Sequence, residues 1–368
     1  MKKILIIGLT NKMGGVETFI KNTTIFSNKE KYIYDFLIHG SEECVFYDEI
    51  STFYEEKNQF FFIDSIKKHP FKSFLQLKKI YKNNKYDIIH LETGSTAEIM
   101  YVFPFVLFNK VKLITHSHNG NGKNKFINAI FKPLVNLCTD KYLACSEVAC
   151  DWLFGKSKRK ECTIINNGID TDRFKYNEEI RKNVQKKLGL QNNKIIGHVG
   201  RFSTQKNHEF LIKIFEKIYE KDNSFRLVLI GVGEEETKIK NIVKNKKLEK
   251  IVFFLGKKDN TQDFYSAFDY FLMPSLYEGL PVVGIEAQCS GLQCFFSNTI
   301  DKQILISDRA KMIDLNSSEN LWANSILETK IDNTNRTKYA TEINEKGYGI
   351  KSTISLLEKI YEVNIYEK

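Results

Sequence analysis

The stretch that decides the fold is Pro274-Ser275-Leu276-Tyr277-Glu278-Gly279-Leu280-Pro281-Val282-Val283-Gly284-Ile285-Glu286. It follows a short apolar run, residues 270–273, which predicts a buried strand. Pro281 suits the first position of a helix, because its missing N–H has no partner to lose there. We therefore expect a strand, a loop and a helix in succession, which is the repeating unit of a parallel α/β sheet.

Two carboxylates frame this expected loop. Glu278 falls on the loop at the end of the strand, and Glu286 falls about one turn inside the helix. Gly279 lets a ligand approach the backbone closely, and the helix start offers free N–H groups at the positive end of the helix dipole. The two carboxylates can accept hydrogen bonds from hydroxyl groups, and the helix start can bind an anion. Together they suit a ligand that joins sugar to phosphate, as a nucleotide sugar does.

The same alternation of buried strand and helix runs through the chain and predicts a parallel α/β fold. The expected strands of the first half are residues 3–8, 34–38, 88–91, 112–115, 141–145 and 163–165. After a polar helix near residues 178–190, the expected strands are 194–199, 226–230, 251–255, 270–273 and 293–297. The architecture is thus repeated twice, with a crossover near residues 170–177, and ligands of such sheets bind at the carboxyl ends of the strands.

Bulk properties exclude several classes of protein. A chain of 368 residues predicts about two domains. Its apolar runs are all far shorter than the roughly 20 residues of a membrane-spanning helix. The start resembles a signal peptide, but Asn11 and Lys12 interrupt its short apolar run, so a first strand is expected. Seven cysteines without a Cys-x-x-Cys pair indicate reduced thiols and no structural zinc site.

The net charge of +10 is concentrated in one region. Residues 57–160 contain 18 Lys and Arg against 7 Asp and Glu. Within that region, residues 67–80 and 122–132 mix lysines with bulky apolar side chains at helical spacing. Two interpretations stay open: packed helices with a solvated lysine face, and attachment to an anionic membrane surface. No nucleic-acid-binding motif is present, so a nucleic-acid partner is not expected.

Further candidate loops follow other expected strands. Arg201 and Lys206 come after the first strand of the second half, where two cations suit a diphosphate. Gly231-Val232-Gly233 and Gly256-Lys257 end the next two strands and could present backbone groups to a base.

The first half offers weaker signals. Gly14 and Gly15 follow the first strand, but G-x-G-x-x-G is absent, which disfavours a dinucleotide fold. His116 and His118 end the fourth expected strand, and no nearby carboxylate or cysteine completes a metal site in the sequence. We expect these histidines to contact a sugar or phosphate. Asx-turn chemistry explains the triplet from Asp170 to Asp172, so no metal is expected there.

Several motifs occur together in one order. These are Gly200-Arg201 with Lys206, Gly231-Val232-Gly233, Phe254-Leu255-Gly256, and Pro274-Ser275 through Glu278 and Glu286. The first half adds Gly14-Gly15, Cys145-Ser146-Glu147, and Asn167-Gly168-Ile169-Asp170 with Phe174. This ordered set resembles retaining glycosyltransferases of family 4, which includes many bacterial capsule and exopolysaccharide enzymes. The likeness covers nearly the whole chain. One departure is Asn166, where the family often has proline at a turn position.

The resemblance implies an α/β fold of the GT-B type, with two Rossmann-like doubly wound parallel-sheet domains facing each other across a cleft. Residues 1–172 would bind the acceptor, and residues 173–350 the nucleotide sugar. A C-terminal helix in residues 351–368 would pack back on the first domain. The implied activity is metal-independent hexosyl transfer, with no cofactor, from a nucleotide-diphosphate sugar, with UDP as the expected nucleotide.

The resemblance also implies roles for single residues. Arg201 and Lys206 would neutralise the donor diphosphate as it leaves. Glu286 would bind the ribose hydroxyls, while Glu278 would hold the transferred sugar. The implied donor site also contains Gly14, Gly15, Gly233, Gly256, Lys257, Gly279 and Leu280. The candidates for catalysis are Arg201, Lys206, Glu278, His116 and His118. Either His116 or His118 would be the histidine that the family has on its acceptor side.

The expected acceptor is a glycan or a polyprenyl-diphosphate-linked glycan at the cytoplasmic face of the plasma membrane, with peripheral contact to anionic lipid. Two alternatives remain open. A nucleotide-sugar epimerase of the same fold would convert its donor without an acceptor. A non-catalytic accessory subunit would bind the donor without turnover, although retention of Arg201, Lys206, Glu278 and Glu286 argues against lost activity.

Overall fold

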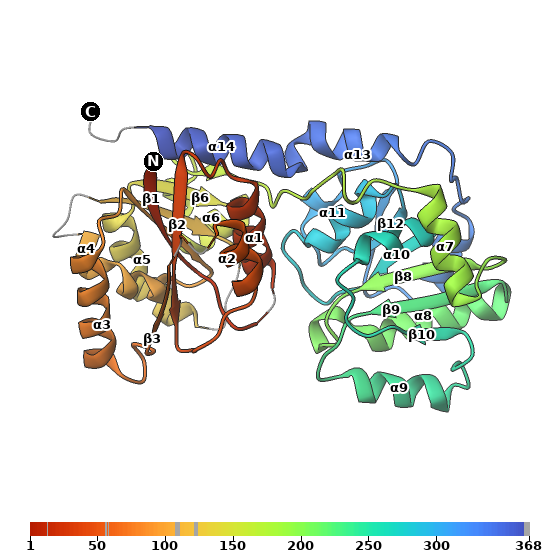
Figure 1. Ribbon diagram of the computed structural model, residues 1–368. Coiled ribbons are helices and arrows are strands. Elements are labelled where there is room, and N and C mark those ends of the chain that lie inside the picture. Colours follow the sequence, from red (N-terminus) through yellow and green to blue (C-terminus); the bar gives the residue numbers. More distant parts are fainter. Residues whose placement is uncertain (13, 56, 58, 107–110, 121–123, 364–368) are drawn as a thin grey trace. The chain divides into compact units, whose positions relative to one another are not determined.

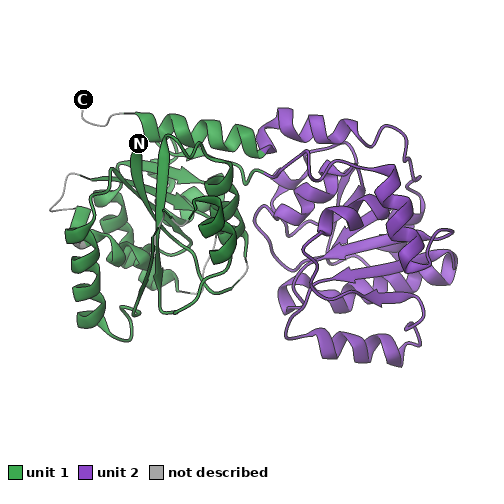
Figure 2. Cartoon of the chain, viewed as in Figure 1, with its two compact units in different colours: residues 1–168, 350–368 green, residues 169–349 purple. Residues whose placement is uncertain are grey.

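The structure is a computed structural model that describes residues 1–368 except 13, 56, 58, 107–110, 121–123 and 364–368. The chain forms two compact units (Figure 2). Unit 1 contains Met1–Gly168 and Ile350–Lys368, and unit 2 contains Ile169–Gly349. The sequence-based domain boundaries fall after residue 172 and after residue 350. Each unit contains one parallel sheet covered by helices on both faces, which is the Rossmann-like architecture.

Unit 1 has a seven-stranded sheet in the order β3-β2-β1-β4-β5-β6-β7, and every printed pairing is parallel. Its strands are β1 (Lys2–Ile7), β2 (Tyr32–His39), β3 (Phe60–Ile63), β4 (Ile88–Thr93), β5 (Lys112–Ser117), β6 (Lys141–Ala144) and β7 (Thr163–Ile164). Six of these were expected from the sequence. The edge strand β3, most of whose residues are only partly buried, was missed.

The helices of unit 1 are α1 (Gly15–Phe26), α2 (Tyr47–Phe53), α3 (Pro70–Asn83), α4 (Phe103–Val106), α5 (Lys125–Cys138), α6 (Glu147–Leu153) and α14 (Ile350–Glu362). Alternate residues of β1 enter different cores, because successive strand side chains point to opposite faces. Ile4 and Ile6 pack with α1 and α14, whereas Leu5 and Ile7 pack with α3, α5 and α6. Figure 1 shows α1 and α3 on opposite sides of this sheet.

Unit 2 has a six-stranded sheet in the order β10-β9-β8-β11-β12-β13, again with every printed pairing parallel. Its strands are β8 (Lys194–Val199), β9 (Phe225–Ile230), β10 (Val252–Phe254), β11 (Tyr270–Met273), β12 (Gln293–Ser297) and β13 (Ala310–Ile313). The sequence did not indicate β13, since a lysine and partly exposed positions interrupt its apolar character. The other five strands lie where they were expected.

The helices of unit 2 are α7 (Glu178–Leu188), α8 (His208–Lys221), α9 (Glu236–Asn245), α10 (Thr261–Ala267), α11 (Val282–Cys289), α12 (Glu319–Leu327) and α13 (Lys338–Ile343). One expectation about α11 was wrong. Pro281 is the N-cap residue, with extended backbone angles, and the helix begins at Val282. Glu286 still falls about one turn inside α11. Among the described residues, no helix has the length and apolarity needed to cross a membrane.

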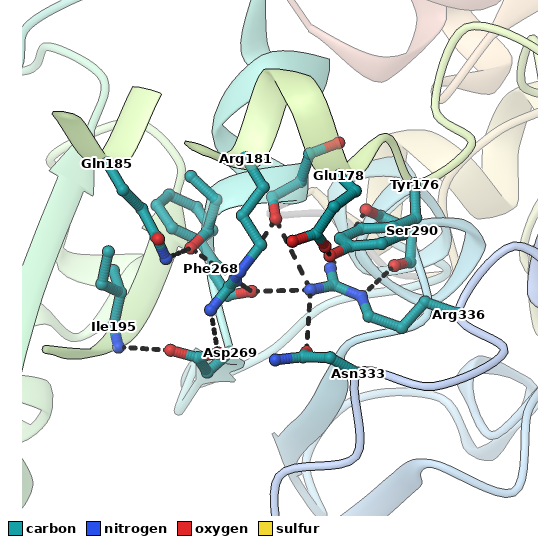
Figure 3. A network of polar contacts seen from close by, with 12 residues as sticks. Tyr176, Glu178, Arg181, Gln185, Ile195, Phe268, Asp269, Ser290, Asn333 and Arg336 are labelled. Carbon is teal, nitrogen blue, oxygen red and sulfur yellow. Dashed lines mark hydrogen bonds and ion pairs between the residues drawn. The ribbon is translucent and has the colours of Figure 1, made fainter. Parts of the chain in front are cut away.

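A buried arginine network fixes the end of α10 (Figure 3). Arg336 is 1% exposed and donates to the carbonyl oxygens of Tyr265 at 3.0 Å, Phe268 at 3.0 Å and Ser290 at 2.9 Å. Arg181 donates to the Phe268 carbonyl at 3.0 Å and forms an ion pair with Asp269 at 2.7 Å. The last carbonyls of a helix have no partner within the helix, so the two guanidinium groups supply the missing donors.

The environment of Arg336 shows that this arrangement has a cost. Burial and, to a smaller extent, the nearby positive charge of Arg181 lower the pKa of its guanidinium to about 9. The ring of Tyr176 lies 4.1 Å from the guanidinium carbon and offers partial compensation through its π face. Unit 2 thus depends on Arg336 for the geometry of the segment that connects α10 to β11.

We predict that Arg336→Met destabilises unit 2 by on the order of 3 kcal/mol, because it leaves several buried carbonyl oxygens without donors. Chemical denaturation followed by tryptophan fluorescence measures the loss, since Trp322 is completely buried in this unit. The matched control is Arg173→Met, whose side chain lies at the surface. Equal stability of the two variants would contradict the structural role of Arg336.

Candidate donor-sugar site

The loops that follow four strands of unit 2 are joined by hydrogen bonds at the carboxyl edge of the sheet. The Phe202 N–H donates to the Val232 carbonyl at 3.1 Å, which joins the loops after β8 and β9. The Leu276 N–H donates to the Gln205 carbonyl at 2.8 Å, which joins the loops after β8 and β11. The Gly231 N–H reaches the Gly256 carbonyl at 2.9 Å, which adds the loop after β10. Residues 200–207, 231–235 and 274–279 therefore form one surface.

Lys206 and Glu278 are brought together on this surface. The Lys206 Nζ lies 2.7 Å from the Glu278 Oε1, and the two side chains are only 14% and 12% exposed. A short 3-10 turn, Thr204–Lys206, ends at Asn207, whose backbone is left-handed with φ 55°. The Asn207 side-chain amide then donates to the Pro274 carbonyl at 3.1 Å. This bond joins the loop that carries Lys206 to the loop that carries Glu278.

Arg201 lies at a more exposed position. Its guanidinium lies 2.9 Å from the Glu234 carboxylate, with side chains 63% and 56% exposed. Exposed pairs of this kind contribute little to stability, so an incoming anion can replace Glu234 at small cost. The Lys257 side chain is also exposed and lies 3.8 Å from Asp259.

Glu286 is oriented by a residue that the sequence did not reveal. The Tyr265 hydroxyl, on α10, donates to the Glu286 Oε2 at 3.0 Å. Burial raises the pKa of Tyr265 well above its usual value, and the neighbouring Glu286 charge raises it further, so the phenol remains a donor. Because Arg336 holds the Tyr265 carbonyl, the network of Figure 3 also positions this hydroxyl. Nothing in the local sequence pairs α10 with α11.

The glycines of this surface fall into two groups. A Cβ on Gly231 would lie 2.0 Å from the Gly200 carbonyl oxygen, and one on Gly233 would lie 2.3 Å from the Phe202 carbonyl oxygen. These two glycines therefore permit the close packing of neighbouring loops. Gly256 and Gly279 have no atom of the described residues within 4 Å of an added Cβ. Leu280 is 7% exposed and packs in the hydrophobic core of unit 2.

In unit 1, the structure corrects the expectation that no carboxylate lies near the histidines. Glu92 of β4 lies beside His116, with 2.9 Å between Oε2 and Nδ1, and beside His118, with 2.5 Å between Oε2 and Nε2. His90 Nε2 lies 3.3 Å from the Glu92 Oε1. Parallel pairing sets Glu92 opposite His116, and that pairing register was not visible in the sequence. His116 is completely buried, and His118 follows at the end of β5.

Burial and charge act against each other in this cluster. Burial lowers the pKa of His116 to about 4, although the Glu92 charge partly raises it. For Glu92, burial opposes ionisation, but the surrounding histidines dominate and place its pKa well below the usual value. Elsewhere in unit 1, Gly14 is the N-cap residue of α1, and no atom of the described residues lies within 4 Å of a Cβ added at Gly15. Their expected approach to a donor remains a prediction.

Two family models match the chain. A model described as glycosyl transferases group 1 matches residues 180–319, and one described as glycosyltransferase family 4 matches residues 13–173. The protein is therefore a glycosyltransferase, with the two-sheet architecture of the GT-B fold. It belongs to glycosyltransferase family 4.

Individual relatives agree with this assignment. The chain is 28% identical to the putative glycosyltransferase EpsF of Bacillus subtilis, over 99% of this chain and 97% of that protein. It is also 28% identical to the Escherichia coli UDP-Gal:alpha-D-GlcNAc-diphosphoundecaprenol alpha-1,3-galactosyltransferase, over 67% of each chain. Among solved structures, Anabaena HepE in complex with UDP-glucose superimposes with a TM-score of 0.80 at 17% identity, covering 98% of this chain and 99% of that one.

Proposed function

We propose that this enzyme moves a hexose or N-acetylhexosamine from a UDP-sugar to a glycan or lipid-linked glycan acceptor in surface polysaccharide biosynthesis. The observation that carries the proposal is the Lys206–Glu278 ion pair at the carboxyl edge of the unit 2 sheet. Relatives support it: HepE has been solved with UDP-glucose, and the E. coli galactosyltransferase is named for a UDP-sugar donor and a diphosphoundecaprenol-linked acceptor. These relatives do not favour an epimerase or an accessory subunit.

The pairing of Lys206 with Glu278 is suited to a ligand that joins phosphate to sugar. An ammonium group carries three donors, so Lys206 can keep Glu278 and bind a phosphate oxygen as well. Arg201 adds a forked donor for a second phosphate oxygen once it leaves Glu234. Glu278 and the backbone beside Gly279 would then hold the sugar hydroxyls, and Glu286 would accept from the ribose hydroxyls.

The proposed transfer retains configuration at the anomeric carbon. The bond between that carbon and the diphosphate oxygen breaks, and the electron pair leaves with the diphosphate. Lys206, Arg201 and the N-terminus of α11 stabilise the developing negative charge, which is why we propose metal-independent chemistry at this site. The acceptor hydroxyl attacks the oxocarbenium-like sugar from the face that the leaving group vacates. Its proton passes to a phosphate oxygen of the departing nucleotide.

For the acceptor, we assign unit 1 and its strand-end histidine. His118 follows β5 directly at the carboxyl edge of the sheet, whereas His116 lies within the strand, so His118 is the better candidate of the two for contact with substrate. The hydrogen bond from His118 to Glu92 would hold the imidazole in one orientation.

We also propose that unit 1 attaches to the cytoplasmic face of an anionic membrane. The helices α3 and α5 cover the same face of the sheet and present large apolar side chains outward. Phe71 is 85% exposed on α3, while Phe126 and Leu137 are 79% and 74% exposed on α5. Lysines accompany them on both helices, and this combination of apolar and cationic groups suits an anionic bilayer.

Replacing single charges at the donor site tests the proposed activity. We expect Lys206→Ala and Glu286→Ala each to reduce transfer from UDP-sugar by about a hundredfold or more, because each removes a contact to the diphosphate or the ribose. The assay follows radiolabelled sugar into acceptor, and proton NMR of the product reports the anomeric configuration. Lys213→Ala, on the exposed side of α8, is the matched control. Near-normal turnover in both site variants, with folding intact, would refute the assignment.

Sedimentation with lipid vesicles tests the membrane attachment. We predict that the double variant Phe71→Ser, Phe126→Ser loses most binding to vesicles that contain phosphatidylglycerol, because two exposed aromatic anchors are removed. Wild-type binding should also weaken with added salt, because the lysines act through screened charge. The control is Leu321→Ser, an exposed apolar position of unit 2. Binding that is equal in all three proteins would contradict this surface assignment.

A further inference from the structure

Four ionisable side chains are buried together on one face of the unit 1 sheet. His90 and Glu92 occupy alternate positions of β4, and His116 and His118 occupy alternate positions at the end of β5. Their side chains are only 0–3% exposed. The surroundings are apolar: the ring of Phe19 lies 5.0 Å from that of His116, within the core that α1 and α14 cover. Such groups are costly to bury unless a partner satisfies them.

The protein alone satisfies these groups only in part. Glu92 accepts a hydrogen bond from His118, but among the described residues His90 Nε2, His118 Nδ1 and both ring nitrogens of His116 have no hydrogen-bond partner. His90 Nε2 lies 3.3 Å from Glu92 Oε1, and His116 Nδ1 lies 2.9 Å from Glu92 Oε2. An unsatisfied buried nitrogen costs about 1–3 kcal/mol, so several of them together are a substantial penalty.

The separations match those of a metal site. One ligand atom from each of His90, Glu92 and His116 lies within 4.8 Å of the others. Nitrogen and oxygen ligands placed 2.0–2.1 Å from a tetrahedral zinc ion lie about 3.3 Å from one another. The distance from His90 Nε2 to Glu92 Oε1 has that value, and the distance from His116 Nδ1 to Glu92 Oε2 is 2.9 Å.

We propose that His90, Glu92 and His116 bind one divalent transition-metal ion, zinc foremost, while His118 stays hydrogen-bonded to Glu92. Imidazole and carboxylate are the ligand types that such ions select, and the ion would satisfy one ring nitrogen of His90 and one of His116 while balancing the buried carboxylate. In the part of the chain that the structure describes, no Lys or Arg forms an ion pair with Glu92.

A second layer of contacts supports this site. The Tyr361 hydroxyl lies 2.8 Å from His90 Nδ1, so the opposite nitrogen of the ring faces the carboxylate. Metal-binding histidines are commonly held by such a bond to their other nitrogen. Tyr361 belongs to α14, so the ion would connect β4 and β5 to the helix that closes this face of unit 1. The proposed ion is bound by side chains of unit 1, whereas the proposed donor contacts lie in unit 2.

The metal content of the full chain tests the proposal. The protein is purified without chelator and with any histidine tag removed, and plasma mass spectrometry counts metal ions per chain. We expect about one zinc per chain, and a melting temperature that falls on chelation and recovers when zinc is added back. Replacement with Co²⁺ should give the visible absorption of a four-coordinate ion with nitrogen and oxygen ligands. Less than about a tenth of an equivalent of metal, with no thermal response to zinc, would overturn the proposal.

Variants show where the ion binds. Glu92→Gln and His116→Gln should each reduce the zinc content below about a tenth of an equivalent, while His69→Gln, at an exposed position before α3, should retain it. Wild-type stoichiometry in Glu92→Gln would overturn the site. If either variant fails to fold, the Co²⁺ spectrum of the wild type decides, because an intense thiolate charge-transfer band would move the ion to a cysteine site and refute the proposal.

Discussion

Parallel strand pairing is the constraint on which each unit depends. In a parallel sheet every strand ends at the same edge, so loops far apart in sequence are brought to one surface. In unit 2 this geometry places Lys206, after β8, within 2.7 Å of Glu278, after β11. In unit 1 it sets Glu92 of β4 opposite His116 of β5. Both polar clusters are therefore products of strand order rather than of local sequence.

The two clusters differ in how their charges are balanced. Lys206 and Glu278 compensate each other while keeping a small exposed fraction, so an anionic ligand can join the pair without first paying the full desolvation of a buried ion. Around Glu92 the partners are histidines inside an apolar core, and four of their ring nitrogens lack hydrogen-bond partners among the described residues. The Lys206–Glu278 pair suits a substrate that binds and dissociates in each turnover. The cluster around Glu92 suits the permanently bound metal ion that we propose.

The sequence predicted most strands because strands buried on both faces appear as continuous apolar runs, as in β1, β8 and β11. It missed β3 and β13, which are short strands at the sheet edges. It proposed Lys206 and Glu278 as site residues from their positions after strands, and Glu286 from its position in the helix that follows. Tyr265 and Glu92 were not found, because their contacts depend on helix packing and on pairing register rather than on any local pattern.

Binding of the donor nucleotide to unit 2 tests the central claim most directly. Calorimetric melting of the full chain should show a higher melting temperature with a saturating UDP-sugar, since a ligand at a hundred times its Kd contributes about 2.7 kcal/mol. The account predicts that Lys206→Met, which keeps the length of the side chain and removes its charge, loses most of this shift. An equal shift in that variant, or no shift with any UDP-, GDP- or ADP-sugar, would contradict it.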